Sequence, residues 1–106
     1  MASASAIHIG ADENVTLTGM TGGGAYLNSA SVATWSLKLA STGAEVASGN
    51  LSYVASSNGN YLGVIPSSVT ATLTEDARYW IDITFRQGDY DDRRRLVRRA
   101  AYRERT

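Results

Sequence analysis

The residues best suited to chemistry lie near the end of the chain, where three aspartates precede a run of arginines. The aspartates are Asp89, Asp91 and Asp92, and seven arginines follow from residue 93 onward. Each guanidinium is planar, permanently charged and able to form paired hydrogen bonds with a carboxylate or a phosphate. The predicted partner-binding arginines are Arg93, Arg94, Arg95, Arg98, Arg99 and Arg103.

Charge balance favours an acidic protein over nucleic acid as the partner of these arginines. The 106-residue chain has a formal net charge of zero, whereas nucleic-acid-binding domains carry a basic surplus. The neighbouring aspartates would repel phosphate, and Tyr90 and Tyr102 alone form a poor stacking platform. We expect the arginines to be unpaired within the chain and to meet acidic groups of a partner. A third interpretation stays open, in which the charges only keep a strand edge from pairing with other chains.

Catalytic and metal-binding patterns are weak. His8 is the single histidine, it lies between Ile7 and Ile9 in a predicted edge strand, and the chain has no cysteine. A serine-hydrolase triad or a zinc site would need more than this. The three aspartates lack the glycine and distal glutamate of an EF-hand loop, and the glycines at 22–24 lack the Lys-Ser/Thr of a phosphate-binding loop. The sequence therefore predicts no enzyme activity, no metal and no cofactor.

Trp80 is a further candidate contact residue. It alternates outward from Tyr79 in a predicted strand, and exposed tryptophan is enriched at protein interfaces. The alternative is that neighbouring strands cover its ring. Together with Tyr26 and Tyr61 it also gives a possible stacking surface for a glycan.

The elements that position these residues are short runs of alternating apolar and polar residues, which are typical of strands. The clearest runs are 32–39 and 79–85; shorter ones are 7–9, 15–17, 45–47, 51–53 and 61–65. Turn signals such as Asn58-Gly59 separate them. The spacing predicts an all-β fold, an immunoglobulin-like antiparallel β-sandwich of about seven strands.

Tyr79 supports this fold class because it stands where the run 79–85 begins, six residues after Leu73. A tyrosine there can fold its hydroxyl back onto the preceding turn, as in the tyrosine corner of immunoglobulin-like sandwiches. An ordinary core tyrosine is the alternative.

The arginine segment can be read as a helix or a strand. A helix would place Leu96, Val97, Ala100 and Ala101 in one stripe. The acidic turn 87–92 follows a clear strand, so we favour a strand from Arg93 to Ala101 with residues 102–106 as an exposed basic tail.

Length and composition indicate one globular domain over residues 1–106, with 43% hydrophobic and 19% charged residues. Residues 1–9 are a candidate N-terminal arm. The absence of cysteine favours assembly in a reducing cytoplasm. We see no signal-peptide pattern and no apolar run near the roughly 20 residues that span a bilayer.

The order of several short motifs resembles small immunoglobulin-like structural proteins of tailed bacteriophages, found in the head and neck region. The motifs are LTGM, GAYLNSASVATWSLKLASTGAEV, LSYVASSNGNYLGVIPSS and LTEDARYWIDITF. They extend from Val15 to Phe85, and the arginine-rich end is more basic than the family pattern.

The resemblance implies a non-enzymatic virion protein, present in many copies or as a homo-oligomer and bound to the major capsid protein or other virion proteins. It implies a minor capsid or decoration protein, assembled in the host cytoplasm, that stabilises the head. A head–tail connector or neck component is the alternative within this class, and a surface glycan-binding module is the alternative outside it.

Overall fold

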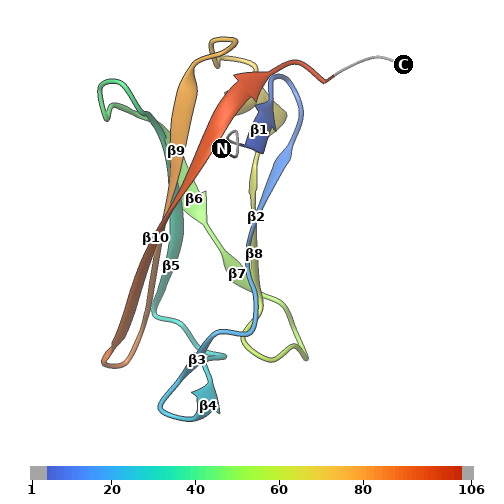
Figure 1. Ribbon diagram of the computed structural model, residues 1–106. Coiled ribbons are helices and arrows are strands. Elements are labelled where there is room, and N and C mark those ends of the chain that lie inside the picture. The colour runs from blue at the N-terminus through green and yellow to red at the C-terminus, as the bar shows by residue number, and fades with distance from the viewer. Residues whose placement is uncertain (1–4, 104–106) are drawn as a thin grey trace.

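The computed structural model describes residues 5–103 and consists of ten strands and one short helix (Figure 1). The strands are β1 (Ser5–His8), β2 (Glu13–Leu17), β3 (Thr21–Gly22), β4 (Ala25–Tyr26), β5 (Val32–Leu39), β6 (Glu45–Asn50), β7 (Ser52–Tyr53), β8 (Tyr61–Ile65), β9 (Arg78–Gln87) and β10 (Tyr90–Ala101). The helix α1 (Ser67–Thr70) follows Pro66. The predicted all-β class is confirmed.

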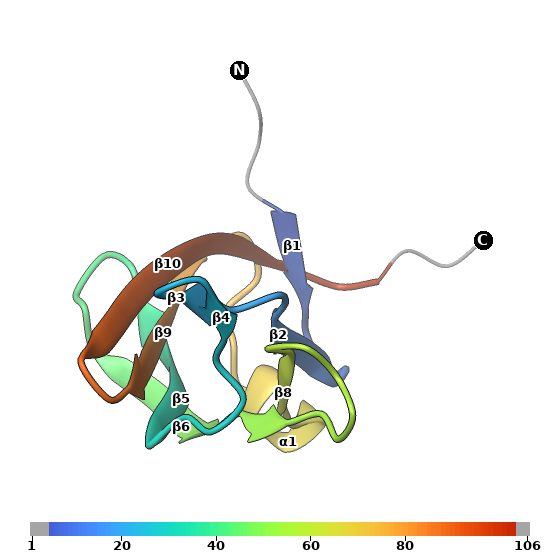
Figure 2. The same ribbon diagram turned by 90° about the horizontal axis from the view of Figure 1, so that it is seen from below.

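Two sheets form the two layers of the molecule, and a small hairpin extends from one end (Figure 1). The larger sheet has the order β1-β10-β9-β5-β6, and the smaller has the order β2-β8-β7. Strands β3 and β4 form the separate hairpin. All strand pairs are antiparallel except β1 and β10, which run parallel. Figure 2 shows β1 next to the C-terminal part of β10.

The core lies between the two sheets and follows the predicted alternation. In β5 and β9 the inward positions include Trp35, Leu37, Ile81, Ile83 and Phe85, each at most 3% exposed. They meet inward residues of β2 and β8, and burial of each large apolar side chain stabilises the fold by roughly 1.5–3 kcal/mol. The outward positions of the same strands are thereby directed to solvent.

Tyr79 folds back onto the turn that precedes its strand. The backbone N–H of Thr74 donates a hydrogen bond of 2.9 Å to the Tyr79 hydroxyl oxygen. The tyrosine ring is 4% exposed, so this contact ties the turn to the core at the start of β9. The predicted hydroxyl contact is therefore confirmed.

The strand count is ten rather than about seven. Strands β3, β4 and β7 have only two residues each, too few for alternation to reveal them. The parallel pairing of β1 with β10 also differs from a purely antiparallel arrangement.

The prediction of an N-terminal arm at residues 1–9 is wrong for residues 5–9, the part of this segment that the structure describes. Ser5 to His8 pair with Arg98 to Ala101, and Ile7 is 0% exposed. An apolar residue on each side of His8 gains burial by docking on the core, so this segment joins the sheet. Residues 1–4 lie outside the described residues.

The arginine segment is a strand, as favoured above, but β10 begins earlier, at Tyr90. Its pairing with β9 extends down to Tyr90 opposite Gln87, which leaves Gly88 and Asp89 as the turn. Tyr102 and Arg103 are exposed, as expected for the tail, and residues 104–106 lie outside the described residues.

Candidate functional site

The candidate site is the outer face of the larger sheet, where strand pairing aligns side chains in rows. Three rows cross β5, β9 and β10: Thr34–Thr84–Arg93, Ser36–Asp82–Arg95 and Lys38–Trp80–Val97. Successive strand residues point to opposite faces, so these rows point away from the core. With the outward residues at the two ends of β9 and β10, they form what we call the basic face. Its members are Thr34, Ser36, Lys38, Arg78, Trp80, Asp82, Thr84, Arg86, Asp91, Arg93, Arg95, Val97 and Arg99.

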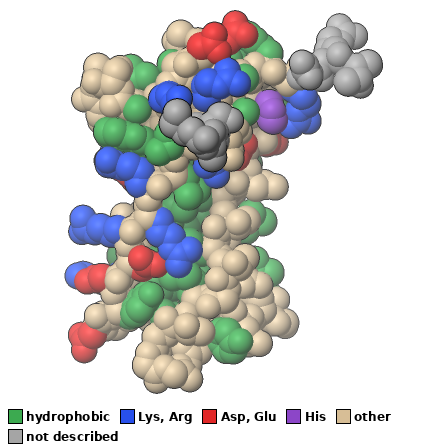
Figure 3. Space-filling view, viewed as in Figure 1, with side chains coloured by type: hydrophobic (Ala, Val, Ile, Leu, Met, Phe, Trp, Pro, Cys, Tyr) green, Lys and Arg blue, Asp and Glu red, His purple; other side chains and the backbone are tan. Residues whose placement is uncertain are grey.

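Positive charge dominates this face. Six of its residues are basic and two are acidic. Figure 3 shows lysine and arginine side chains along the side of the molecule formed by the β9–β10 hairpin. A surface with this excess of cations attracts an acidic partner and repels a basic one.

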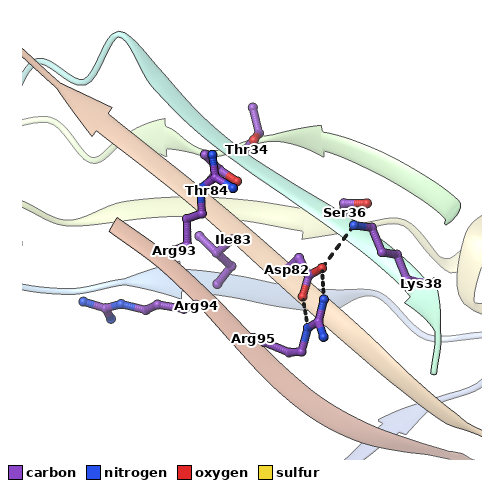
Figure 4. Close-up of a pocket in the computed structure, with 9 residues that line it drawn as sticks. All are labelled: Thr34, Ser36, Lys38, Asp82, Ile83, Thr84, Arg93, Arg94 and Arg95. Carbon is purple, nitrogen blue, oxygen red and sulfur yellow. Dashed lines mark hydrogen bonds and ion pairs between the residues drawn. The ribbon is translucent and has the colours of Figure 1, made fainter. Parts of the chain in front are cut away.

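A shallow groove of about 520 Å³ crosses the middle of the basic face (Figure 4). Thr34, Thr84 and Arg93 lie along one part of it, and Ser36, Lys38, Asp82 and Arg95 along the other. The groove has hydroxyl and cationic donors from three adjacent strands, which gives it the character of an anion-binding surface.

Asp82 is the single carboxylate in the groove lining, and two cations hold it. Arg95 donates bonds of 2.7 and 2.9 Å to its two carboxylate oxygens, and Lys38 Nζ lies 3.2 Å from Oδ2 (Figure 4). The bond from Arg95 is the main cause of a lowered pKa for Asp82, and Lys38 adds to the effect against the opposing effect of burial. Asp82 therefore stays ionised and offsets only part of the surrounding positive charge.

Arg95 is fixed on two sides. Its guanidinium carbon lies 3.8 Å from the centroid of the Trp80 ring, a cation–π contact. The bond to Asp82 raises the pKa of Arg95. Trp80 is thus partly covered by Arg95. Both interpretations of Trp80 from the sequence hold in part, because the ring faces outward and a residue of the neighbouring strand covers it.

We expect Asp82→Asn to lower the free energy of unfolding near pH 7 by up to ~1 kcal/mol. The pKa of Asp82 is lowered in the fold from its ordinary value of 3.8, so the carboxylate stabilises the protein above that value. This contribution disappears as pH falls through the lower, folded-state pKa. Urea denaturation from pH 7 to about pH 2 should show the two proteins converging at acid pH. Asp89→Asn, in the exposed turn, is the control, and a pH-independent difference for Asp82→Asn would refute the claim.

The sequence-predicted arginines divide between two sides of β10. Arg93, Arg95 and Arg99 are on the basic face, because they align with outward residues of β9. Arg94 and Arg98 align with the inward residues Ile83 and Tyr79 and belong to the other side. Arg103 follows the end of the strand.

The expectation that these arginines are unpaired within the chain is wrong for three of them. Arg95 binds Asp82, Arg94 Nε lies 3.0 Å from Asp92, and Arg99 lies 2.7 Å from Asp76. The β10 pairing and the turn before β9 bring carboxylates from distant positions to these cations. Within residues 5–103, Arg93 has no ion pair.

The carboxylates of the acidic turn do not lie together in the structure. Asp91 and Asp92 are consecutive residues of β10 and point to opposite faces. Arg86 Nε binds Asp91 at 2.7 Å, and this bond is the main cause of the lowered pKa of Asp91. No group of three or more potential metal-ligating side chains occurs among the described residues.

His8 lies on the edge strand β1, as predicted, and its surroundings include Glu13 of β2. Burial raises the pKa of Glu13, while the positive charges of Arg98, His8 and Arg103 act against this shift. These groups come from separate strands and the C-terminal tail.

The three aromatic residues considered for glycan stacking do not form one platform. Tyr61 is 3% exposed, and its hydroxyl donates to the carbonyl of Leu27 at 2.8 Å. Its ring packs edge-on against Phe85 in the core. Tyr26 is half exposed on the small hairpin, and Trp80 is on the basic face. The hypothesis that Tyr61 contributes to a glycan-binding surface is therefore wrong.

Sequence reasoning missed Thr34, Ser36, Lys38, Asp82 and Thr84 as site residues. A signal was present, because each is a polar, outward position of a clear strand, and Lys38 and Asp82 have opposite charges. The sequence alone does not place β5 beside β9, so their rows could not be aligned.

Comparison with protein-family models, curated proteins and solved structures gives no match to this chain. Across residues 5–103 there is no helix with the length and apolar character needed to span a membrane. Functional inference depends on the sequence motifs and on the geometry of the basic face.

Proposed function

We propose that the fold is immunoglobulin-like. The strand order β1-β10-β9-β5-β6 facing β2-β8-β7 matches the two-sheet arrangement of that class, with short additional strands. The buried Trp35 on β5 and the Tyr79 hydroxyl contact at the start of β9 support the same class.

On this scaffold we propose a non-enzymatic bacteriophage virion structural protein, a minor capsid or decoration protein. The observation that carries the proposal is the basic face, with six cations in strand-defined positions and a groove lined by donors. Its charge suits an acidic surface of the major capsid protein. The resemblance of the motifs from Val15 to Phe85 supports a place on the particle.

The affinity of such a protein for a capsid increases when many copies bind to the same particle. A single exposed ion pair contributes about 0–1 kcal/mol, so one basic face alone would bind weakly. Copies arranged on a symmetric shell can associate with one another as well as with the shell, which raises the overall affinity by orders of magnitude.

Counting copies on purified particles tests the proposed role. A decoration protein should be present in roughly hundreds of copies, following the symmetry of the shell, whereas a neck ring would hold about a dozen. Quantitative mass spectrometry, with the major capsid protein as the internal standard, measures the number of copies per particle. About a dozen copies would favour the head–tail connector, and absence from particles would contradict a virion role altogether.

A further inference from the structure

We propose that the row Thr34–Thr84–Arg93 is a binding site for one carboxylate of an extended acidic segment of a partner protein. This inference rests on the proposed docking role of the basic face and names the chemical group that the face would bind. The three residues belong to three adjacent strands and are aligned by pairing of Thr34 with Thr84 and of Thr84 with Arg93.

The donors of this row are uncommitted around the groove. Figure 4 draws no hydrogen bond or ion pair from Thr34, Thr84 or Arg93 to the other residues that line it. Arg93 is exposed and forms no ion pair within residues 5–103, although its charge helps to lower the pKa of nearby Asp91, whose main partner is Arg86. One guanidinium beside two hydroxyls provides the donors that a carboxylate accepts.

The neighbouring row Ser36–Asp82–Arg95, with Lys38, keeps the groove positive without a free carboxylate. Asp82 is already bound by Arg95 and Lys38, so it does not compete for Arg93. The pair of cations also outweighs the charge of Asp82. An incoming carboxylate therefore meets net positive charge and an open guanidinium.

The bound segment is expected to be extended and to lie along β10. Alternate residues of an extended chain are about 6.6–6.8 Å apart, which matches the spacing between successive outward residues of β10. A segment lying along β10 with its carboxylate at Arg93 would place its second-next side chain over Arg95, which is already bound to Asp82, or over Asp91 if the segment runs the other way. That residue should be neutral, because Arg95 already holds a carboxylate and Asp91 would repel a second one. The site is thus expected to prefer Glu-x-Ser to Glu-x-Glu.

A phosphate backbone fits this surface less well. Asp91 is on the same face two residues before Arg93, and Asp82 lies in the next row, so anions on both sides limit a chain of closely spaced phosphates. A single carboxylate bound at Arg93 avoids close contact with both aspartates.

The test uses the purified 106-residue protein labelled with ¹⁵N and a capped peptide, Ac-Ser-Thr-Glu-Thr-Ser-NH₂. We expect weak binding, with Kd of ~1 mM, and amide shift changes centred on Thr34, Thr84 and Arg93. Arg93→Gln should weaken binding about tenfold, as expected for loss of a charge-assisted hydrogen bond. Arg98→Gln removes the same charge from the other side of β10, outside the basic face, and should bind as the wild type does.

Several results would overturn the proposal. They are equal binding of the peptide with Gln in place of Glu, unchanged binding by Arg93→Gln, or shift changes centred elsewhere. Tighter, Arg93-dependent binding of a short oligonucleotide or of inorganic phosphate would also contradict a carboxylate site. Because the test uses no particles, its failure leaves the particle-binding role to be judged separately by copy number.

Discussion

Gly59→Ala is expected to lower the free energy of unfolding by about 3 kcal/mol, the largest effect that we expect from adding one methyl group. Gly59 has a φ of +73°, a conformation that costs an L-residue about 1–2 kcal/mol. An added Cβ would also lie 2.6 Å from the backbone nitrogen of Met20 and in still closer contact with its carbonyl oxygen.

The surrounding backbone has little freedom to move away. The Met20 N–H donates to the Gly59 carbonyl at 2.9 Å, and the Gly59 N–H donates to Asn28 Oδ1 at 2.8 Å. The Leu27 N–H donates to the Met20 carbonyl at 2.8 Å. Substitution would disturb all three bonds together, at the point where the loop after β7 holds the chain that enters β3.

Gly43→Ala is the matched control for this substitution. Gly43 has the same φ of +73°, but an added Cβ there meets no atom within 4 Å. Urea denaturation of the two variants should show a loss of only ~1 kcal/mol for Gly43→Ala. If both variants lose the same stability, the close approach to Met20 has no energetic consequence and the account of this loop is wrong.

The strongest elements could be predicted from the sequence because their alternation extends over many residues. In β5 and β9 the outward and inward faces are as expected, and the inward residues form the core. The Tyr79 contact was also predictable, since it depends on a short, local spacing between the turn and the start of β9.

Other elements could be predicted only in part or not at all, because tertiary contacts create them. For β1, the alternation at residues 7–9 predicted an edge strand, but its start at Ser5 and its parallel pairing depend on docking beside β10. The two-residue strands β3 and β4 depend on the hairpin turn at Gly23 and Gly24, both with positive φ. Such short segments carry too little pattern to be distinguished from loops.

The candidate site was predictable only in part. The arginines of β10 could be identified by composition, and the strand interpretation implies that they alternate between two faces. Their partners could not be identified, because Asp76 and Asp82 lie 23 and 13 residues away from the arginines that they bind. The register between β9 and β10 decides which arginines form ion pairs and leaves Arg93 without one in the described chain.

Loss of particle binding by the double substitution Arg93→Gln and Arg99→Gln is the second large effect that we expect. Both residues are outward on β10, and Arg99 binds Asp76, whose side chain is 78% exposed. Such exposed pairs contribute little to folding, so stability should change little. Docking shields these bonds from water, unlike an exposed ion pair, and each charge-assisted bond lost from such an interface costs roughly 1.5–3 kcal/mol, which predicts at least a hundredfold weaker association.

Asn14→Glu with Thr16→Glu is the control for this double substitution. These two exposed residues lie on the smaller sheet, aligned with Val64 and Leu62, away from the basic face. Both pairs of substitutions lower the net charge equally, so the comparison separates the position of the charge from its amount. Urea denaturation should first establish that both variants fold.

The most direct measurement of the docking role is the number of copies bound to particles that lack the protein, after each purified variant is added back. The account predicts that wild type and the Asn14/Thr16 variant fill the particles to the same level and that the Arg93/Arg99 variant leaves them nearly empty. Equal occupancy by all three proteins would show that the basic face does not hold this protein on the particle.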